Sequence, residues 1–207
     1  RLVRLLSIKH MQGAMGQRAV DVGMVPVLVE LLGGCEEVQK LAAYSLNLLA
    51  IHHAKAVADA GAVPRLVQAV ASLHDDVRGP AICALESIAD TSMDRIDAVL
   101  AVGILEPLLK AMNESSSIQV LAMGGELLGK LWSGLPLPVP LGESGRFLPV
   151  LVSLLSAPEQ NELVRRSARG ALRHFGGSVP TLVLRLKDLQ APILTVTCWS
   201  SVVPWHR

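Results

Sequence analysis

The chain has 207 residues and a formal net charge of +1, so its overall charge directs it toward neither nucleic acid nor a membrane surface. Apolar residues make up 51% of the sequence and aromatic residues only 3%, a composition that suits packed helices better than a β-sandwich. Three scattered cysteines, Cys35, Cys83 and Cys198, are poor material for a disulfide framework or a zinc site. They favour a reducing compartment, and we expect an intracellular, cytoplasmic protein, with nuclear and ciliary locations left open.

The first residues indicate a helix that belongs to a preceding structural unit. Residues 1–10 read RLVRLLSIKH, with apolar residues at helical spacing and no partner of their own nearby in the sequence. We therefore expect residues 1–16 to end an upstream repeat.

One phrase then recurs along the chain. It reads DVGMVPVLVELL at 21–32, DAGAVPRLVQAV at 59–70, AVGILEPLLKAM at 101–112 and ESGRFLPVLVSLL at 143–155, with a weaker copy from Gly177. The glycine can end one helix in a left-handed conformation, and the proline suits the first turn of the next helix. A period near 40 residues is typical of helical arrays and of some propellers.

Longer helical stretches follow each phrase. They cover 36–52, 75–90, 116–132 and 159–175, and shorter ones precede three of the glycines at 17–22, 54–60 and 95–102. Pro80 predicts that the second long helix starts or kinks near Arg78–Gly79. Ser156 followed by Glu159 fits a capping box that would open the fourth.

The succession of a short, a medium and a long helix resembles the armadillo repeat. The residues that carry the resemblance are the A(V/D)-x-G-x-V-P-x-L-V phrase and V-x-x-x-A-x-x-A-L in the long helix, over about residues 17–190. It implies an all-α, right-handed superhelical solenoid of four to five degenerate repeats. Its repeats would cover 17–53, 54–94, 95–133 and 134–176, with residues 177–207 forming a degenerate repeat, a cap or a tail.

Two departures from the repeat pattern stand near the end. Prolines at alternate positions forbid a helix in 134–144, so a Pro-rich connector replaces the short helix of the fourth repeat. Residues 191–205 combine prolines with β-branched threonines, and they are too short for a membrane span.

The resemblance implies a non-catalytic scaffold or adaptor that holds a protein or an extended peptide along the concave surface formed by the long helices. An architectural component of a larger assembly, such as a ciliary axoneme, is the alternative, and nuclear-import cargo binding is the second alternative. Armadillo proteins that read basic nuclear-localisation peptides place a Trp, and an Asn four residues later, on successive long helices. Here those positions hold other residues: Tyr44, Cys83 and Gly170 for Trp, and Leu48, Ser87 and His174 for Asn.

Candidate chemistry is otherwise sparse. Adjacent His52 and His53 point about 100° apart on a helix, and the other histidines lack ligand neighbours, so we expect no metal, cofactor, small-molecule substrate or enzymatic activity. Arginines at four-residue spacing on the fourth long helix suggest an acidic partner. The predicted partner-binding residues are Tyr44, Leu48, Ser87, Arg165, Arg166, Arg169, Arg173 and His174.

Overall fold

The computed structural model describes residues 14–90, 92–133, 145–156 and 161–175. Within these ranges every regular element is a helix and no strand occurs. The expected all-α solenoid is therefore confirmed. The predicted upstream helix at 1–10, the Pro-rich connector at 134–144 and the degenerate unit at 177–207 lie outside the described residues, and the repeat boundaries remain predictions.

The helices fall into three sets by their place in each unit, and we keep the names short, medium and long, although the short and medium ones differ little in length. The short ones are α2 (Ala14–Asp21) and α7 (Met93–Ala101). The medium ones are α3 (Met24–Leu31), α5 (Ala62–Val70), α8 (Leu105–Glu114) and α11 (Leu148–Ser156). The long ones are α4 (Glu36–Asp59), α6 (Asp75–Ala89), α9 (Ile118–Ser133) and α12 (Glu162–Leu172), the last continued by a 3₁₀ turn, η1 (Arg173–Phe175).

The turns that open the medium helices follow the recurring phrase. Gly23, Gly61 and Gly103 have φ of 73°, 77° and 81°, a left-handed conformation in which a side chain would be strained. Pro26 and Pro64 are the third residues of α3 and α5, where a missing N–H removes no bond within the helix. The phrase therefore encodes a chain reversal followed by a new helix, as predicted.

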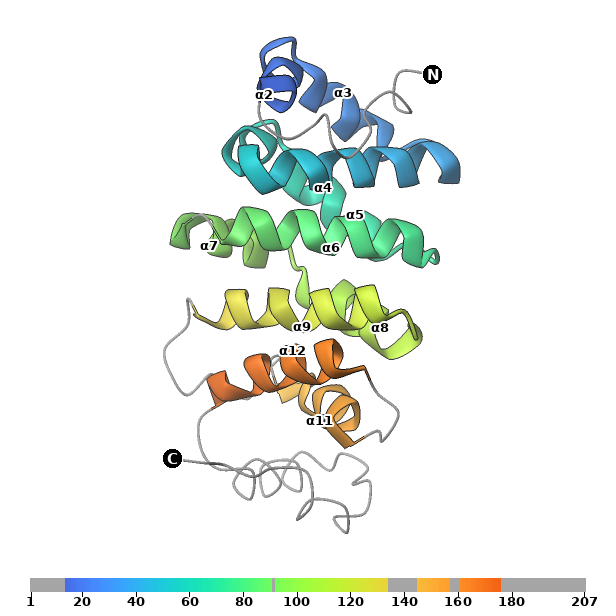
Figure 1. Cartoon of the computed structure of the whole chain (residues 1–207), viewed down its shortest axis with the longest axis vertical. Helices are drawn as coiled ribbons and strands as arrows, with labels where there is room; N and C mark the ends of the chain where they lie inside the picture. The colour runs from blue at the N-terminus through green and yellow to red at the C-terminus, as the bar shows by residue number, and fades with distance from the viewer. Residues whose placement is uncertain (1–13, 91, 134–144, 157–160, 176–207) are drawn as a thin grey trace.

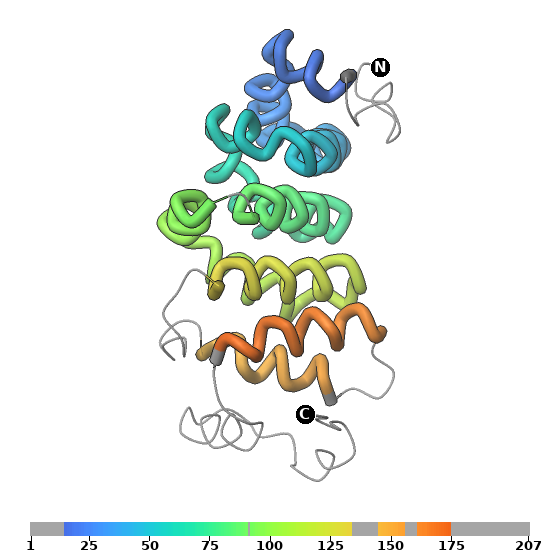
Figure 2. Tube along the Cα trace, turned by 60° about the vertical axis from the view of Figure 1, so that its left-hand side comes forward, coloured from blue at the N-terminus to red at the C-terminus, as the bar shows by residue number. Residues whose placement is uncertain are grey.

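The long helices stack side by side and form one layer of the molecule. In Figure 1, α4, α6, α9 and α12 succeed one another down the long axis, each packed against the next, with the medium helices in a second layer behind them. Figure 2 shows the same stack after a turn of 60°. Because each unit packs only on its neighbours, the fold is built by repetition rather than around one central core.

A continuous apolar core runs through the stack. It consists mainly of Leu, Val, Ile and Ala side chains, as the composition indicates. Its two largest fully buried side chains are Trp132 at the end of α9 and Phe147 just before α11. Their rings meet edge to face, with centroids 5.9 Å apart, so an aromatic pair joins the third and fourth units.

Two helix boundaries differ from the prediction, and one expected break is present. The helix α6 begins at Asp75, not near Arg78, and Pro80 lies inside it. The helix α12 begins at Glu162, and the side chain of Asn161 accepts a hydrogen bond from the Leu163 N–H at 2.8 Å, so Asn161 is its N-cap rather than Ser156. The break expected between the stretches 36–52 and 54–60 is present, because the backbone of α4 leaves helical geometry at His53, where φ is −129° and ψ is 34°.

Polar pairs link consecutive units at a spacing of about one repeat. One set joins the N-terminal ends of successive long helices and the residues beside them, and another contact joins their C-terminal ends. The pairs are Glu36–His74, Lys40–Asp76, Arg78–Glu114, Asp75–Ser115 and Asp90–Lys130, and Glu106–Arg146 adds a contact between α8 and the start of the fourth unit. We call these contacts the inter-repeat pairs.

Candidate protein-binding face

Two hollows with mixed polar and apolar linings lie along the long helices. The first hollow, of about 660 Å³, lies where the C-terminal parts of α4 and α6 meet, and the second, of about 740 Å³, lies between α9 and α12. Both are wide enough to receive side chains of another molecule. We call the side of the long helices on which these hollows open the groove face.

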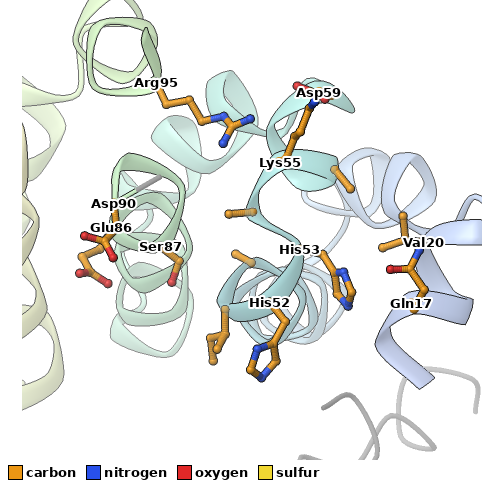
Figure 3. A pocket seen from close by; sticks show the side chains of 14 residues that line it. Gln17, Val20, His52, His53, Lys55, Asp59, Glu86, Ser87, Asp90 and Arg95 are labelled. Carbon is orange, nitrogen blue, oxygen red and sulfur yellow. The ribbon is translucent and has the colours of Figure 1, made fainter. Parts of the chain in front are cut away.

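The kink in α4 shapes the first hollow. His52 and His53 lie at the kink, and Lys55 and Asp59 continue beyond it, while Ser87 and Arg95 approach from α6 and α7 (Figure 3). His52 is exposed and His53 is partly buried. The Nε2 atom of His53 is buried and makes no hydrogen bond within the described residues.

Three carboxylates set the charge between the two hollows. Glu86 and Asp90 line the first hollow, and Glu126 lines the second. Burial raises the pKa of Glu86, the Lys130 ammonium opposes that shift, and Asp90 and Glu126 add to it. The ammonium of Lys130 is itself bonded to Asp90, which raises the pKa of Lys130. The middle of the groove face therefore combines clustered carboxylates with one lysine that partly neutralises them.

The second hollow is basic. Four of its lining side chains are cationic: Lys130, Arg166, Arg169 and Arg173. Glu126 is the one carboxylate among its lining residues. Arg169 lies 3.4 Å from Glu162 outside the hollow. Burial lowers the pKa of His174, so this histidine adds no full charge at neutral pH. Because the arginines lie within two turns of one helix, their guanidinium groups can converge on one anionic ligand.

Glycines in the long helices fall into two kinds. At Gly125 an added methyl group would lie 2.7 Å from Ser167 Oγ and 3.0 Å from the backbone carbon of Ser167, so close packing requires this glycine. At Gly124 it would lie 2.9 Å from Met112 Sδ, the end of a flexible side chain that can move aside. At Gly129 and Gly170, which line the second hollow, an added methyl group would meet nothing within 4 Å. A glycine inside a helix costs about 1 kcal/mol relative to alanine, and packing within the described residues gives no reason for that cost at Gly129 and Gly170.

Of the eight predicted partner-binding residues, five line one of the two hollows and three do not. Ser87 lines the first hollow, and the second is lined by Arg166, Arg169, Arg173 and His174. Tyr44 is partly buried against the core, and Leu48 is only 7% exposed. Arg165 lies on α12 but is not among the residues that line the second hollow. The role of all eight in binding a partner remains a prediction.

Sequence reasoning missed the contribution of α9 to the second hollow. Glu126, Gly129 and Lys130 face the arginines of α12 from the neighbouring helix. The spacing of about 40 residues between Lys130 and Gly170 was a usable signal, because residues one repeat apart lie on adjacent helices of a solenoid.

The described residues show little sign of other chemistry. None of their His, Cys, Asp and Glu side chains form a group of three or more that could hold a metal ion. Burial raises the pKa of the Cys83 thiol to about 11, which disfavours the reactive thiolate. No helix in the described part of the chain has the length and apolar character that crossing a bilayer demands.

Residues 52–90 match the Armadillo/beta-catenin-like repeat, and together with the stacked three-helix units this places the chain in the armadillo-repeat family. Among solved structures, a designed armadillo repeat protein in complex with the peptide (KR)4 superposes with a TM-score of 0.69 at 22% identity, covering 91% of this chain and 80% of that one. An engineered protein superposes with a TM-score of 0.66 at 26% identity, covering 92% and 85%.

Curated relatives are importin alpha subunits of plants. Importin subunit alpha-2 of Arabidopsis thaliana is 34% identical over 77% of this chain and 30% of its own length. Importin subunit alpha-1b of Oryza sativa subsp. japonica is 32% identical over 65% of this chain and 26% of its own length. The chain thus spans about a third of the length of these relatives.

Proposed function

We propose that this chain is a non-catalytic module that holds an extended segment of a partner protein along the groove face, in an intracellular compartment. The observation that carries the proposal is that each hollow is lined by residues of two successive long helices that pack on each other. Support also comes from the designed armadillo protein of the same fold, which was solved with a peptide. An extended chain has a repeat of about 3.3 Å per residue, so a peptide of modest length can reach from one hollow to the other.

Selection of random 12-residue peptides on the chain, followed by hydrogen exchange with the best binder, tests this function. We expect bound peptide to protect surface amides at the exposed sides of α4, α6, α9 and α12. The medium helices α5 and α8 serve as the internal reference, because they lie in the other layer. Protection confined to α5 and α8, or a failure to enrich any peptide, contradicts the proposal.

Nuclear-import cargo binding is the second candidate, and the importin alpha relatives favour it. The carboxylates Glu86, Asp90 and Glu126 on the groove face could attract a basic segment. Against it stand the positions that hold Tyr44, Cys83 and Gly170 instead of Trp, and the one tryptophan in the described residues, Trp132, is fully buried. Enrichment of Lys- and Arg-rich peptides in the same selection would favour import over other partners.

A further inference from the structure

The second hollow has two properties that the fold itself does not require. One is the excess of cationic side chains around it, which comes from Arg166, Arg169 and Arg173, because Lys130 and Glu126 of α9 offset each other in charge. The other is the pair of bare helical positions, Gly129 and Gly170, which carry no positive φ and touch no neighbour that would demand a glycine. Both properties point to a ligand that comes close to the helix backbones.

The arrangement of the arginines limits the shape of that ligand. Arg166 and Arg173 are seven residues apart, so their Cα atoms are separated by about 10.5 Å along the helix axis. Arg169 lies between them on the same side. About three extended residues of a peptide cover the same distance, so two or three acidic side chains of one short segment can each reach a guanidinium group. Arginine is suited to this role because its planar fork binds carboxylates through two parallel hydrogen bonds.

The glycines make the close approach possible. Gly129 and Gly170 line the second hollow, and a Cβ added at either position would enter open space. With hydrogen at both positions, the backbone of the ligand can lie near the helices while its acidic side chains reach Arg166 and Arg173. Glu126 is the one lining carboxylate that opposes an anion, and Lys130 stands one turn away from it on α9.

We propose that the second hollow binds an acidic segment of a partner protein, with Arg166, Arg169 and Arg173 as the charge-reading residues and Gly129 and Gly170 as the floor. This inference rests on the proposed function and names the chemical class of the partner at one end of the groove face. It differs from the arginine set that four-residue spacing selects, because Arg165 does not line the hollow and Arg166 does.

The test uses the whole chain and three fluorescein-labelled peptides, (Glu-Ala)4, (Gln-Ala)4 and (Lys-Arg)4, with anisotropy as the readout. We expect (Glu-Ala)4 to bind at least about tenfold more tightly than (Gln-Ala)4, with an affinity that falls as salt rises. The triple variant Arg166→Gln, Arg169→Gln, Arg173→Gln should weaken that binding at least about tenfold, because several charge-assisted contacts are lost together. A charge-matched control replaces three exposed cations on other helices: Arg18→Gln, Arg65→Gln, Lys110→Gln. It should change binding by less than about twofold.

The glycine variants give a readout that overall charge does not affect. Gly129→Ala and Gly170→Ala should each raise the melting temperature, because alanine favours the helix, and each should weaken (Glu-Ala)4 binding several-fold. Equal losses in the two triple variants, unchanged binding by both glycine variants, or tighter binding of a single-stranded RNA oligonucleotide would overturn the inference. Failure of (Glu-Ala)4 alone also overturns it. The wider peptide-binding function would then stand or fall on the 12-residue selection.

Discussion

Two glycines four residues apart on α9 should respond in opposite directions to the same substitution. At Gly125 a methyl group would lie 2.7 Å from Ser167 Oγ and 3.0 Å from the Ser167 carbonyl carbon, a backbone atom that cannot rotate away. At Gly129 it would meet nothing within 4 Å. Since α9 and α12 pack directly against each other, an alanine at Gly125 must push the two long helices apart.

The magnitudes follow from two opposing terms. Replacing a glycine inside a helix by alanine favours folding by about 1 kcal/mol. Forcing an extra carbon into a packed interface costs about 1–3 kcal/mol. We therefore expect Gly125→Ala to destabilise the chain by about 1 kcal/mol and Gly129→Ala to stabilise it by somewhat less than 1 kcal/mol. For a chain of this size, a difference of about 2 kcal/mol separates the two melting temperatures by about 4–8 °C.

Thermal unfolding followed by circular dichroism at 222 nm measures the difference. Adding Ser167→Gly to Gly125→Ala removes the hydroxyl and its Cβ from the contact but leaves the backbone carbon, so we expect only partial recovery relative to Ser167→Gly alone. The reasoning is refuted if Gly125→Ala melts at or above the temperature of the unmodified chain, or if Gly129→Ala melts below it.

Three further predictions concern side chains elsewhere. Arg78→Ala should destabilise the chain by about 1–3 kcal/mol, because Arg78 is 3% exposed and bonds to Glu114 at 2.7 Å and to Asp75 at 3.4 Å. The control is Lys110→Ala, which removes an exposed pair to the same Glu114 and should cost less than about 0.5 kcal/mol in urea unfolding. Equal costs for the two variants would contradict the distinction between a buried and an exposed pair. Because the folded-state pKa of Glu86 is raised, the folded state binds the Glu86 proton more tightly than the unfolded state does and loses stability as the pH rises from about 4.5 through the raised value. Glu86→Gln should therefore raise the urea midpoint more at pH 7 than at pH 4. A gain that shrinks as the pH rises would show that the pKa of Glu86 is shifted the other way. In a Cys198→Ser background at pH 8, a thiol-reactive disulfide should label exposed Cys35 well before Cys83, whose thiol is partly buried with a pKa of about 11. The fast phase of labelling should disappear when Cys35→Ser is added. Persistence of that fast phase would refute the assignment.

The sequence predicts most of the local structure because the signals are local. Gly23 and Pro26 define a turn and a helix start through backbone geometry alone, and the structure has both. Pro80 misleads: a proline inside a helix removes one backbone hydrogen bond, yet α6 persists through it, and the residues from Val77 to Leu85 are almost all buried.

The candidate site is less accessible to sequence reasoning because it depends on how neighbouring units are offset. The face of α12 that bears Arg166 rather than Arg165 on the second hollow is set by its packing on α9, where Gly125 admits Ser167. A helical wheel gives the angle between side chains but not the direction of the partner helix. For the inter-repeat pairs, a spacing of about one repeat indicates which residues lie on adjacent helices, but not which of their side chains meet.

The inter-repeat pairs have a consequence for the shape of the whole stack. Several of the linked side chains are about half exposed, such as Lys40 and Asp76, and an exposed pair adds only about 0–1 kcal/mol to stability. Each pair, however, joins the edge of one unit to the edge of the next, away from the apolar core. At that distance even a weak attraction affects the angle between the two units. Contacts at both ends of the long helices therefore restrain the angle between neighbouring units, and so the pitch and curvature of the solenoid, more than they stabilise the folded state. Salt screens these exposed pairs. The width of the groove face should therefore change with ionic strength under conditions in which every helix is still folded.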